Sequence, residues 1–385
     1  MEFSKLYEQK YDALQKAVNR QEGAYVPTAV TNNGGGFSWC GKTIFEVAGK
    51  HQEYAEAITS FMSDMWVDTN ILSMLTATPR QSEAFPTAEY HFTKDGTLTH
   101  MAATYMKPDE YDQLIENPGA FIGNVLLPRK YPYLYEDRET AKAALKVYAE
   151  ESVSNFVMQV ATTNKYMAEA YGVSTCTNIM CNLNTPLDHI FDFFRGFRGT
   201  LTDLRRQPAK VQAALDAIWE YHNPANLSAP YDPSQGYPFQ PCHIPAYLSP
   251  KQFKELYWPY EKQLVEWVAQ SGGKILLVME GNWENIWENL LELPKDSLIL
   301  TVDEDDFLKV HERLGDHHIL CGGLRLADTR LKSFDQIKDD IKRVIDTCAP
   351  GGGFIFSTDR GFVTPGDVNP TLVECFNFAH EYSKK

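Results

Sequence analysis

Short apolar segments alternate with amphipathic segments through the last third of the chain. Four apolar runs, each followed by a segment with helical periodicity, occur after residue 270. The expected strands are 274–280, 297–303, 318–321 and 353–357, and the expected helices are 283–293, 307–314, 333–348 and 370–382. Near-continuous apolar strands separated by helices are typical of a parallel sheet covered by helices. The pattern therefore predicts an α/β fold, either an open doubly wound sheet or a closed (β/α)8 barrel.

The earlier part of the chain has a more mixed pattern. We expect amphipathic helices near 3–20 and 43–75, a β-hairpin that turns at Asp95-Gly96, and mostly helix over 140–222 with a short strand near 173–180.

A proline-rich stretch separates these two patterns. Prolines occur at Pro224, Pro230, Pro233, Pro238, Pro241, Pro245 and Pro250. Proline lacks an N–H donor and interrupts helices, so we expect 224–250 to be a long ordered loop. Loops of this length inside compact domains are usually functional.

Composition excludes several classes of function. The chain has 36 Lys and Arg against 51 Asp and Glu, a formal net charge of −15, which argues against nucleic-acid binding. It has no run of 18 apolar residues and no apolar segment near its start, so we expect no membrane span, no secretory signal and a cytoplasmic location. The seven cysteines are an odd number, so packing, metal binding or nucleophilic chemistry is expected rather than a disulfide framework.

Polar residues follow the C-terminal strands at the end where parallel α/β proteins carry their functional groups. These residues are Glu280, Asp303, Glu304, Cys321, Ser357 and Asp359. Glu and Cys side chains bind zinc, and His243 in the proline-rich loop would complete a three-ligand site with an open position. The alternatives are a buried packing thiol at Cys321 and a loop hydrogen bond at His243. Glu280 ends an apolar run, so its carboxylate needs a cation, a partner or a catalytic role.

Three other patterns are weaker. Residues 36–43 fit the Walker A pattern letter for letter, but no apolar strand precedes them, so we interpret them as a glycine-rich entry to a helix at Thr43. Residues 316–321 approach the D-x-H-x-x-G pattern of corrinoid-carrying domains, but Cys321 replaces the final glycine. We interpret that segment as structural and the chain as not itself a cobalamin carrier. Aromatic residues that suit either an aromatic substrate or ordinary packing are Tyr237, Phe239, Tyr247 and Trp283.

Several segments in combination resemble a known family. They are 248–260, 278–281, 292–294, 314–316, 321–323 and 351–356, with weaker similarity at 41–43 and 107–111. Over about residues 140–380 the chain resembles the uroporphyrinogen decarboxylase superfamily, and more narrowly its branch of corrinoid-dependent methyltransferases and O-demethylases. The resemblance implies a (β/α)8 barrel with zinc at the carboxyl ends of its strands. We expect residues 136–385 to form this barrel and residues 1–135 to be a helical and hairpin extension packed on it as one structural unit.

Two departures from the family narrow the expected activity. Nothing in residues 1–60 matches the Arg-Gln-Ala-Gly-Arg type motif of the decarboxylases, and the H-x-C zinc positions of the coenzyme M methyltransferases are Val278 and Glu280 here. We therefore expect a zinc-dependent methyltransferase that demethylates a methyl ether, most simply a methoxylated aromatic compound, and passes the methyl group to the cobalt(I) of a separate corrinoid protein. The alternatives are a methylcorrinoid:thiol methyltransferase of the coenzyme M type, a decarboxylase, a non-catalytic binding module and, more remotely, a P-loop nucleotide-binding protein.

The resemblance also implies roles for the candidate residues. The expected zinc ligands are His243, Glu280 and Cys321. The expected catalytic residues are Glu280, Asp303, Glu304 and Asp359, of which the last three are also alternate or supporting metal ligands. The expected substrate-binding residues are Tyr237, Phe239, Tyr247, Trp283 and Arg325. The expected partners are a corrinoid protein and a small-molecule methyl donor, with no nucleic acid and no membrane.

Overall fold

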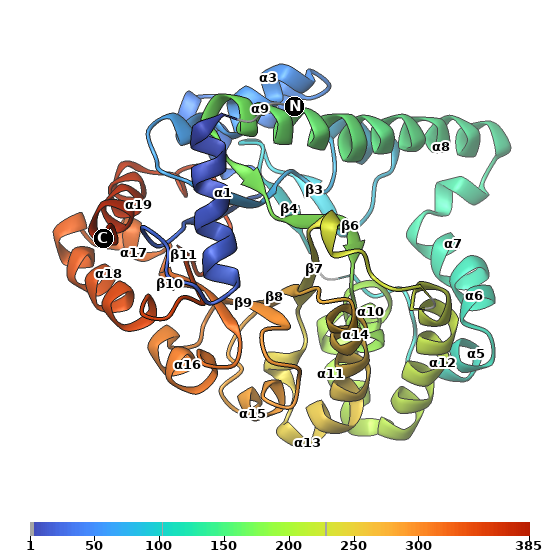
Figure 1. Cartoon of the computed structure of the whole chain (residues 1–385). Helices are drawn as coiled ribbons and strands as arrows, with labels where there is room; N and C mark the ends of the chain where they lie inside the picture. The colour runs from blue at the N-terminus through green and yellow to red at the C-terminus, as the bar shows by residue number, and fades with distance from the viewer. Residues whose placement is uncertain (1–3, 102, 228) are drawn as a thin grey trace.

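The computed structural model describes residues 4–101, 103–227 and 229–385. Its parallel strands form a curled sheet with helices packed around the outside (Figure 1). The strands are β1 (Ala29–Asn32), β2 (Thr69–Ser73), β5 (Ser174–Thr175), β6 (Thr177–Asn182), β7 (Tyr237–Cys242), β8 (Ile275–Met279), β9 (Leu298–Val302), β10 (Ile319–Leu324) and β11 (Phe354–Thr358), with an antiparallel hairpin of β3 (Tyr90–Phe92) and β4 (Leu98–His100).

Helices fill most of the chain between these strands. In the first half they are α1 (Lys5–Val18), α2 (Ile44–Val47), α3 (His51–Ile58), α4 (Pro79–Ala84), α5 (Tyr111–Glu116), α6 (Pro118–Phe121), α7 (Leu127–Lys130), α8 (Arg138–Ser152) and α9 (Val160–Tyr171). In the second half they are α10 (Pro186–His189), α11 (Gly196–Arg206), α12 (Pro208–Asn226), α13 (Pro250–Gln252), α14 (Trp258–Gln270), α15 (Trp287–Leu290), α16 (Phe307–Leu314), α17 (Asp328–Leu331), α18 (Phe334–Cys348) and α19 (Pro370–Tyr382).

The strands are ordered as two parallel sheets that meet along one edge. The larger sheet has the order β11-β10-β9-β8-β7-β6, and the smaller has the order β1-β2-β5. Isolated parallel bridges from Thr28 to Phe356 and from Asn32 to Phe362 connect β1 with the end of the larger sheet. The parallel α/β class is therefore confirmed, while a regular eight-stranded closed barrel stays a prediction.

The four strands of the last third and three of the helices that follow them are confirmed, whereas the helix expected over 283–293 is only the four-residue α15. β8 to β11 lie within one or two residues of the expected strands at most ends, and α16, α18 and α19 lie close to the expected helices. Ser333 and Gln336 form the capping box at the start of α18, where two orphan backbone donors are satisfied. In this part of the chain, hydrophobic periodicity alone was sufficient to predict the strands and most of the helices.

The expectation of a long loop over 224–250 is wrong for residues Tyr237–Cys242, which form β7. Phe239 pairs with Leu276 of β8, and the side chains of β7 alternate between partly and fully buried positions. The missing N–H of Pro238 is tolerated because the pairing with β6 is already irregular beside it. Because of its prolines, strand β7, which lies between β6 and β8, was predicted as a loop.

The first 135 residues were expected to form an extension that packs on the barrel. Two of their strands, β1 and β2, instead pair with each other as part of the parallel strands. The single amphipathic helix expected over 43–75 is wrong, because this stretch forms two short helices, α2 and α3, and then strand β2. The division between 1–135 and 136–385 itself stays a prediction.

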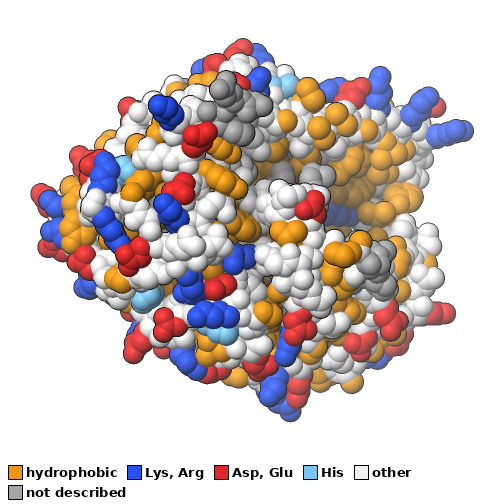
Figure 2. All heavy atoms as spheres, in the orientation of Figure 1, with side chains coloured by type: hydrophobic (Ala, Val, Ile, Leu, Met, Phe, Trp, Pro, Cys, Tyr) orange, Lys and Arg blue, Asp and Glu red, His pale blue; other side chains and the backbone are white. Residues whose placement is uncertain are grey.

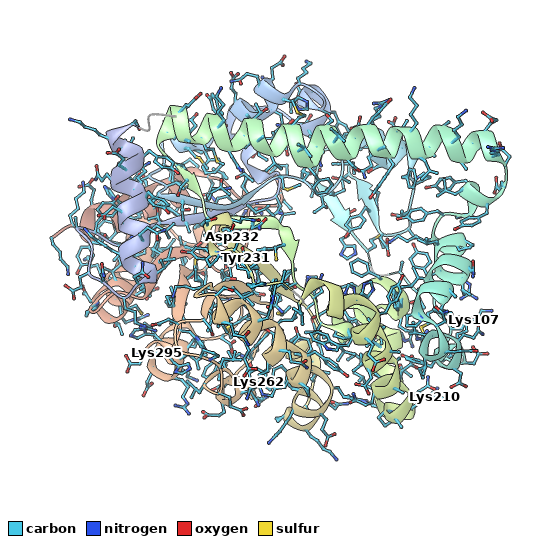
Figure 3. All side chains as sticks on the ribbon, turned by 45° about the vertical axis from the view of Figure 1, so that its right-hand side comes forward. Lys107, Lys210, Tyr231, Asp232, Lys262 and Lys295 are labelled. Carbon is cyan, nitrogen blue, oxygen red and sulfur yellow. The ribbon has the colours of Figure 1, made fainter. Side chains whose placement is uncertain are left out.

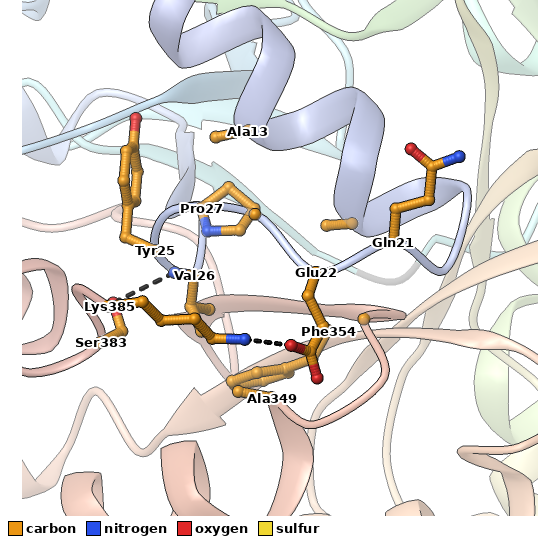
Figure 4. A pocket seen from close by; sticks show the side chains of 13 residues that line it. Ala13, Gln21, Glu22, Tyr25, Val26, Pro27, Ala349, Phe354, Ser383 and Lys385 are labelled. Carbon is orange, nitrogen blue, oxygen red and sulfur yellow. Dashed lines mark hydrogen bonds and ion pairs between the residues drawn. The ribbon is translucent and has the colours of Figure 1, made fainter.

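Helix α1 covers the amino ends of the strands. Leu14, Ala17 and Val18 lie on one helical face and pack with Leu276 and Ile299, which stand near the starts of their strands. The last residue contributes at the same end, where Lys385 pairs with Glu22 beside a cavity of about 40 Å³ (Figure 4). The amino end is thus closed, which leaves the carboxyl ends of the strands for a functional site. Among the described residues, no helix combines the length and the apolar character that crossing a membrane requires.

Candidate functional site

Three side chains form a linear array at the carboxyl ends of β7 and β8. His243 follows β7, Glu280 follows β8, and Asp192 lies in a π-helical segment, η6 (Ile190–Arg195). His243 Nδ1 lies 2.8 Å from Asp192 Oδ2, and His243 Nε2 lies 3.2 Å from Glu280 Oε1. The Asp192 side chain is 7% exposed and the Glu280 side chain is 43% exposed, so the array runs from the interior to open solvent.

The two carboxylates keep His243 charged. Burial opposes the charge, but the hydrogen bonds and the charges of Asp192 and Glu280 raise the pKa of His243 to about 11. Both ring nitrogens then carry protons, and each donates to a carboxylate oxygen. The array therefore presents an imidazolium at neutral pH.

A second buried carboxylate supports this array from behind. Asp188 accepts hydrogen bonds of 2.9 Å from the hydroxyls of Thr185 and Tyr257, and one of 3.4 Å from the backbone N–H of Ile244, next to His243. Burial, with a contribution from Asp192, raises the pKa of Asp188 to about 6. Asp188 thereby fixes the backbone that carries His243.

Two π-helical segments contribute to this geometry. η6 carries Asp192, and η9 (Phe253–Tyr257) ends at Tyr257, whose hydroxyl reaches Asp188. π-Helical turns are rare and frequently lie at functional sites.

Sequence reasoning missed Asp188 and Asp192. They lie four residues apart, so one helical face carries two acids in the run from Leu187 to Phe194, which is otherwise apolar except for His189. An acid in such a run needs a partner, as was argued for Glu280, and the same test applied to helices would have found both residues.

The other predicted catalytic residues gather in a neighbouring groove of about 550 Å³. Asp303, Glu304, Asp359 and Arg325 line it. Asp303 accepts a 3.1 Å hydrogen bond from the backbone of Gly281, beside Glu280, and a 2.7 Å one from Arg360. Burial raises the pKa of Asp359, which accepts a 2.9 Å hydrogen bond from the backbone N–H of Leu326. Asp303 and Glu304 are thus joined to the array through the backbone of Gly281, whereas Asp359 bonds to Leu326 instead.

The three predicted zinc ligands are not brought together as a set. His243 and Glu280 are in contact, but Cys321 is buried inside the sheet, paired in register with Thr301. Thr301 lies two residues before Asp303, so the thiol is deeper than the array, and burial raises its pKa to about 12. Within the described ranges, no three His, Cys, Asp or Glu side chains are arranged to hold a metal ion. Both nitrogens of His243 are also occupied by carboxylates, so these residues do not fit a three-ligand zinc site in this arrangement. Zinc stays a prediction.

The predicted substrate-binding residues have different surroundings. Tyr237 and Phe239 pack against the apolar interior of the sheet, and Trp283 is buried. The Trp283 indole N–H donates to the Glu280 carbonyl at 3.0 Å, so this ring supports the backbone of the site from below. Tyr247 is 52% exposed and packs edge-on against Phe197 with ring centroids 4.8 Å apart. Tyr247 and Arg325 are thus the exposed members of the predicted set.

The Walker-like segment has the structural role expected for it. Gly35–Cys40 forms a 3-10 helix, and Thr43 begins α2 with a capping box to Glu46. In the segment 316–321, the rings of His317 and His318 each donate to a backbone carbonyl at 2.8 Å. Both segments are therefore structural in this conformation.

Comparisons with known proteins bear on this arrangement. Residues 186–382, more than half of the chain, match the family model described as uroporphyrinogen decarboxylase (URO-D). The search of curated proteins finds no match. A solved structure of a methyltransferase from Methanosarcina mazei has a similar fold, with a TM-score of 0.55 and 15% sequence identity over 96% of this chain and 97% of that chain. Asp192, His243 and Glu280 all lie inside the matched range.

Proposed function

Because the chain belongs to the uroporphyrinogen decarboxylase family, we propose that it is a methyltransferase that demethylates an aromatic methyl ether and delivers the methyl group to the cobalt(I) of a corrinoid protein. The observation that carries this proposal is the charged His243, held between Asp192 and Glu280 at the open end of the strands. The fold shared with a protein named as a methyltransferase supports methyl transfer over decarboxylation. So does the lack of an Arg-Gln-Ala-Gly-Arg type motif in residues 1–60.

The chemical problem in ether cleavage is the leaving oxygen. In the proposed step the methyl carbon–oxygen bond breaks and its electron pair stays on oxygen. Cobalt(I) supplies both electrons of the new carbon–cobalt bond and becomes cobalt(III), and the oxygen takes a proton from water to become a phenol. A group that stabilises the developing phenolate lowers this barrier.

His243 is suited to that role. The conjugate acid of a phenolate has a pKa of about 10, like tyrosine, and the pKa of His243 is about 11. The imidazolium can therefore donate a charge-assisted hydrogen bond to the developing phenolate. Asp192 accepts the hydrogen bond of Nδ1 on the buried side. When the methyl donor binds, the half-exposed Glu280 moves away from Nε2, which then donates to the ether oxygen.

We assign no step to zinc, because both nitrogens of His243 bind carboxylates and Cys321 lies deeper in the sheet. Asp303 and Arg360 are assigned a positioning role. They fix Gly281, and through it the backbone next to Glu280.

The test is methyl transfer in vitro. The purified chain is mixed with a cobalt(I) corrinoid protein and a panel of methoxylated aromatic compounds, and the loss of cobalt(I) absorbance and the release of phenol are followed. We expect methylcobalt and phenol in equal amounts. His243→Gln and Asp192→Asn should each lower the rate by about 100-fold, the usual size of a lost acid or oxyanion-stabilising group. His311→Gln, on α16 away from the array, is the matched control.

Two results would overturn the proposal. One is the absence of methylcobalt with every compound of the panel. The other is a full rate in His243→Gln. Release of carbon dioxide from a porphyrinogen by the same preparation would instead favour the decarboxylase alternative.

A further inference from the structure

A wall of aromatic side chains borders the array on the side of the N-terminal segment. We define this aromatic wall as Tyr90, Tyr105, Tyr131 and Phe193, together with the ion pair of Lys130 and Glu89. The space-filling view shows a deep hollow on this side of the molecule, lined mainly by hydrophobic side chains (Figure 2). The side-chain view shows many rings around the same opening (Figure 3).

Lys130 is a cation enclosed by aromatic rings. Its ammonium lies 5.6 Å from the centre of the Tyr105 ring, 5.7 Å from that of Tyr131 and 5.8 Å from that of Phe193. Its side chain is 17% exposed and forms an ion pair with Glu89 Oε2. An ammonium has three N–H donors, and the rings can accept only weakly, so Lys130 has donor capacity left for a ligand.

Glu89, in turn, lacks a hydrogen-bond donor for one of its carboxylate oxygens. Its side chain is 1% exposed, and its Oε1 has no hydrogen-bond partner among the described residues. A buried carboxylate oxygen without a donor is costly, and such orphaned groups in native structures call for an explanation. Lys130 and Glu89 together therefore offer a free donor and a free acceptor side by side.

This pair lies next to the array and not on a remote surface. Phe193, which faces Lys130, directly follows Asp192. Tyr90 directly follows Glu89, and its pKa is raised by burial and by the charges of both Glu89 and Asp192. Backbone hydrogen bonds join the segment that carries Tyr105 to the helical segment that carries Asp192 and Phe193. The N–H groups of Tyr105 and Met106 donate to the Phe194 carbonyl at 2.9 and 2.8 Å.

We infer that Lys130 and Glu89 recognise a hydroxyl group on the ring of the aromatic ligand, and so select methoxyphenols over fully methylated aromatic ethers. A phenolic hydroxyl both donates and accepts, so it matches Glu89 Oε1 and the Lys130 ammonium at once. The rings of the wall pack against the ligand ring. A methoxy group at the same position accepts but does not donate, and leaves Glu89 Oε1 unsatisfied. This inference rests on the proposed function for the role of the ligand, but its test does not need turnover.

The test compares matched ligands by isothermal titration calorimetry. The 2-, 3- and 4-methoxyphenols are each compared with the corresponding 1,2-, 1,3- and 1,4-dimethoxybenzenes on the wild-type chain. We expect at least one methoxyphenol to bind about tenfold more tightly than its partner, the size of one hydrogen bond to a charged group. Equal binding in all three pairs overturns the inference without any variant.

Variants then assign the selectivity to these two residues. Glu89→Gln with Lys130→Met removes both charges together, so no buried charge is left unpaired. We expect this double variant to bind a methoxyphenol and its dimethoxybenzene within about twofold of each other. Lys210→Met is the control, since Lys210 pairs with Asp112 on the outside of the helices below the hollow (Figure 3).

The outcomes separate this inference from the proposed function. Full selectivity in a folded double variant overturns the inference. If that variant does not fold, ultraviolet difference spectra of the bound phenol in the wild type decide, because a phenol bonded to a carboxylate absorbs at longer wavelength than in water, and an unshifted spectrum overturns it. Selective binding without methyl transfer contradicts the proposed function alone, and methyl transfer without selectivity contradicts the inference alone.

Discussion

Asp192 Oδ2 and His243 Nδ1 lie 2.8 Å apart, although the two residues are 51 positions apart in the sequence. Asp192 comes from a π-helical segment and His243 from the loop after β7. Their contact fixes the Nδ1 edge of the imidazole and leaves Nε2 toward the exposed Glu280. Orientation and charge of the ring therefore depend on the same carboxylate.

Replacement of Asp192 by Asn is expected to change the charge of His243. Without the buried carboxylate, the pKa of His243 should fall from about 11 toward its ordinary value of about 6.5. Nitrogen-15 shifts of the histidine rings report protonation directly, and His243→Gln identifies the signal. A neutral His243 in the wild type at pH 8 would contradict this account of the array.

Glu261 is expected to make stability depend on pH. Burial raises the pKa of this carboxyl to about 8, and Gln240 donates to its Oε2 at 2.6 Å. The folded state keeps its proton while the unfolded state ionises near pH 4.5, so stability is full below pH 4.5 and falls as pH rises to about 8.

Glu261→Gln should remove that loss and raise the free energy of unfolding at pH 8 by up to about 4 kcal/mol. Urea unfolding of both proteins at pH 5 and pH 8 measures it. Glu255→Gln, an exposed residue nearby, is the control and should change little at either pH. A variant that is no more stable than the wild type at pH 8 would show that Glu261 is not held protonated.

Cys321→Ala separates the two accounts of the thiol. The zinc prediction expects this variant to lose metal and methyl transfer, whereas its position inside the sheet leads us to expect unchanged metal content and rate. We also expect a loss of about 1 kcal/mol of stability from the lost packing of a small buried side chain. Elemental analysis and thermal unfolding are the measurements. Loss of a bound zinc ion would return Cys321 to the ligand set.

Tyr247→Ala tests the exposed edge of the site. Because the side chain is 52% exposed, we expect a stability change within about 0.5 kcal/mol. Under the proposed function, the loss of the ring beside Phe197 should raise the concentration of methyl donor or corrinoid protein needed for half-maximal rate. Steady-state kinetics with each substrate varied in turn shows which one is affected. Unchanged kinetics for both would exclude a contact with either substrate.

The local pattern of apolar residues was enough to locate the strands that are buried on both faces of the sheet. β8 to β11 are apolar runs, and their ends located Glu280, Asp303 and Asp359 correctly. β1 and β7 were missed because the first carries Thr and Asn and the second carries two prolines, and their burial depends on neighbours far away in the chain.

Within the site, the sequence predicted mainly those residues that lie at or near the ends of strands. His243 and Glu280 were found and do meet, while Cys321 was placed on the right strand at the wrong depth. Asp192 has a partner 51 residues away, and Lys130 and Glu89 meet only through the folding of the N-terminal segment. Such pairs depend on tertiary structure, and no spacing in one sequence reveals them.

The aromatic wall has a consequence for how this protein could diversify. Of the wall and its ion pair, Glu89, Tyr105 and Lys130 precede residue 186, where the match to the family begins, and Phe193 lies within the match, as Asp192, His243 and Glu280 do. Apart from Phe193, the parts that would select a ligand and the parts that would act on it are thus carried by different stretches of chain. Transplanting the 85–135 segment between relatives is therefore a modular route to new ligand preferences on an unchanged reactive centre.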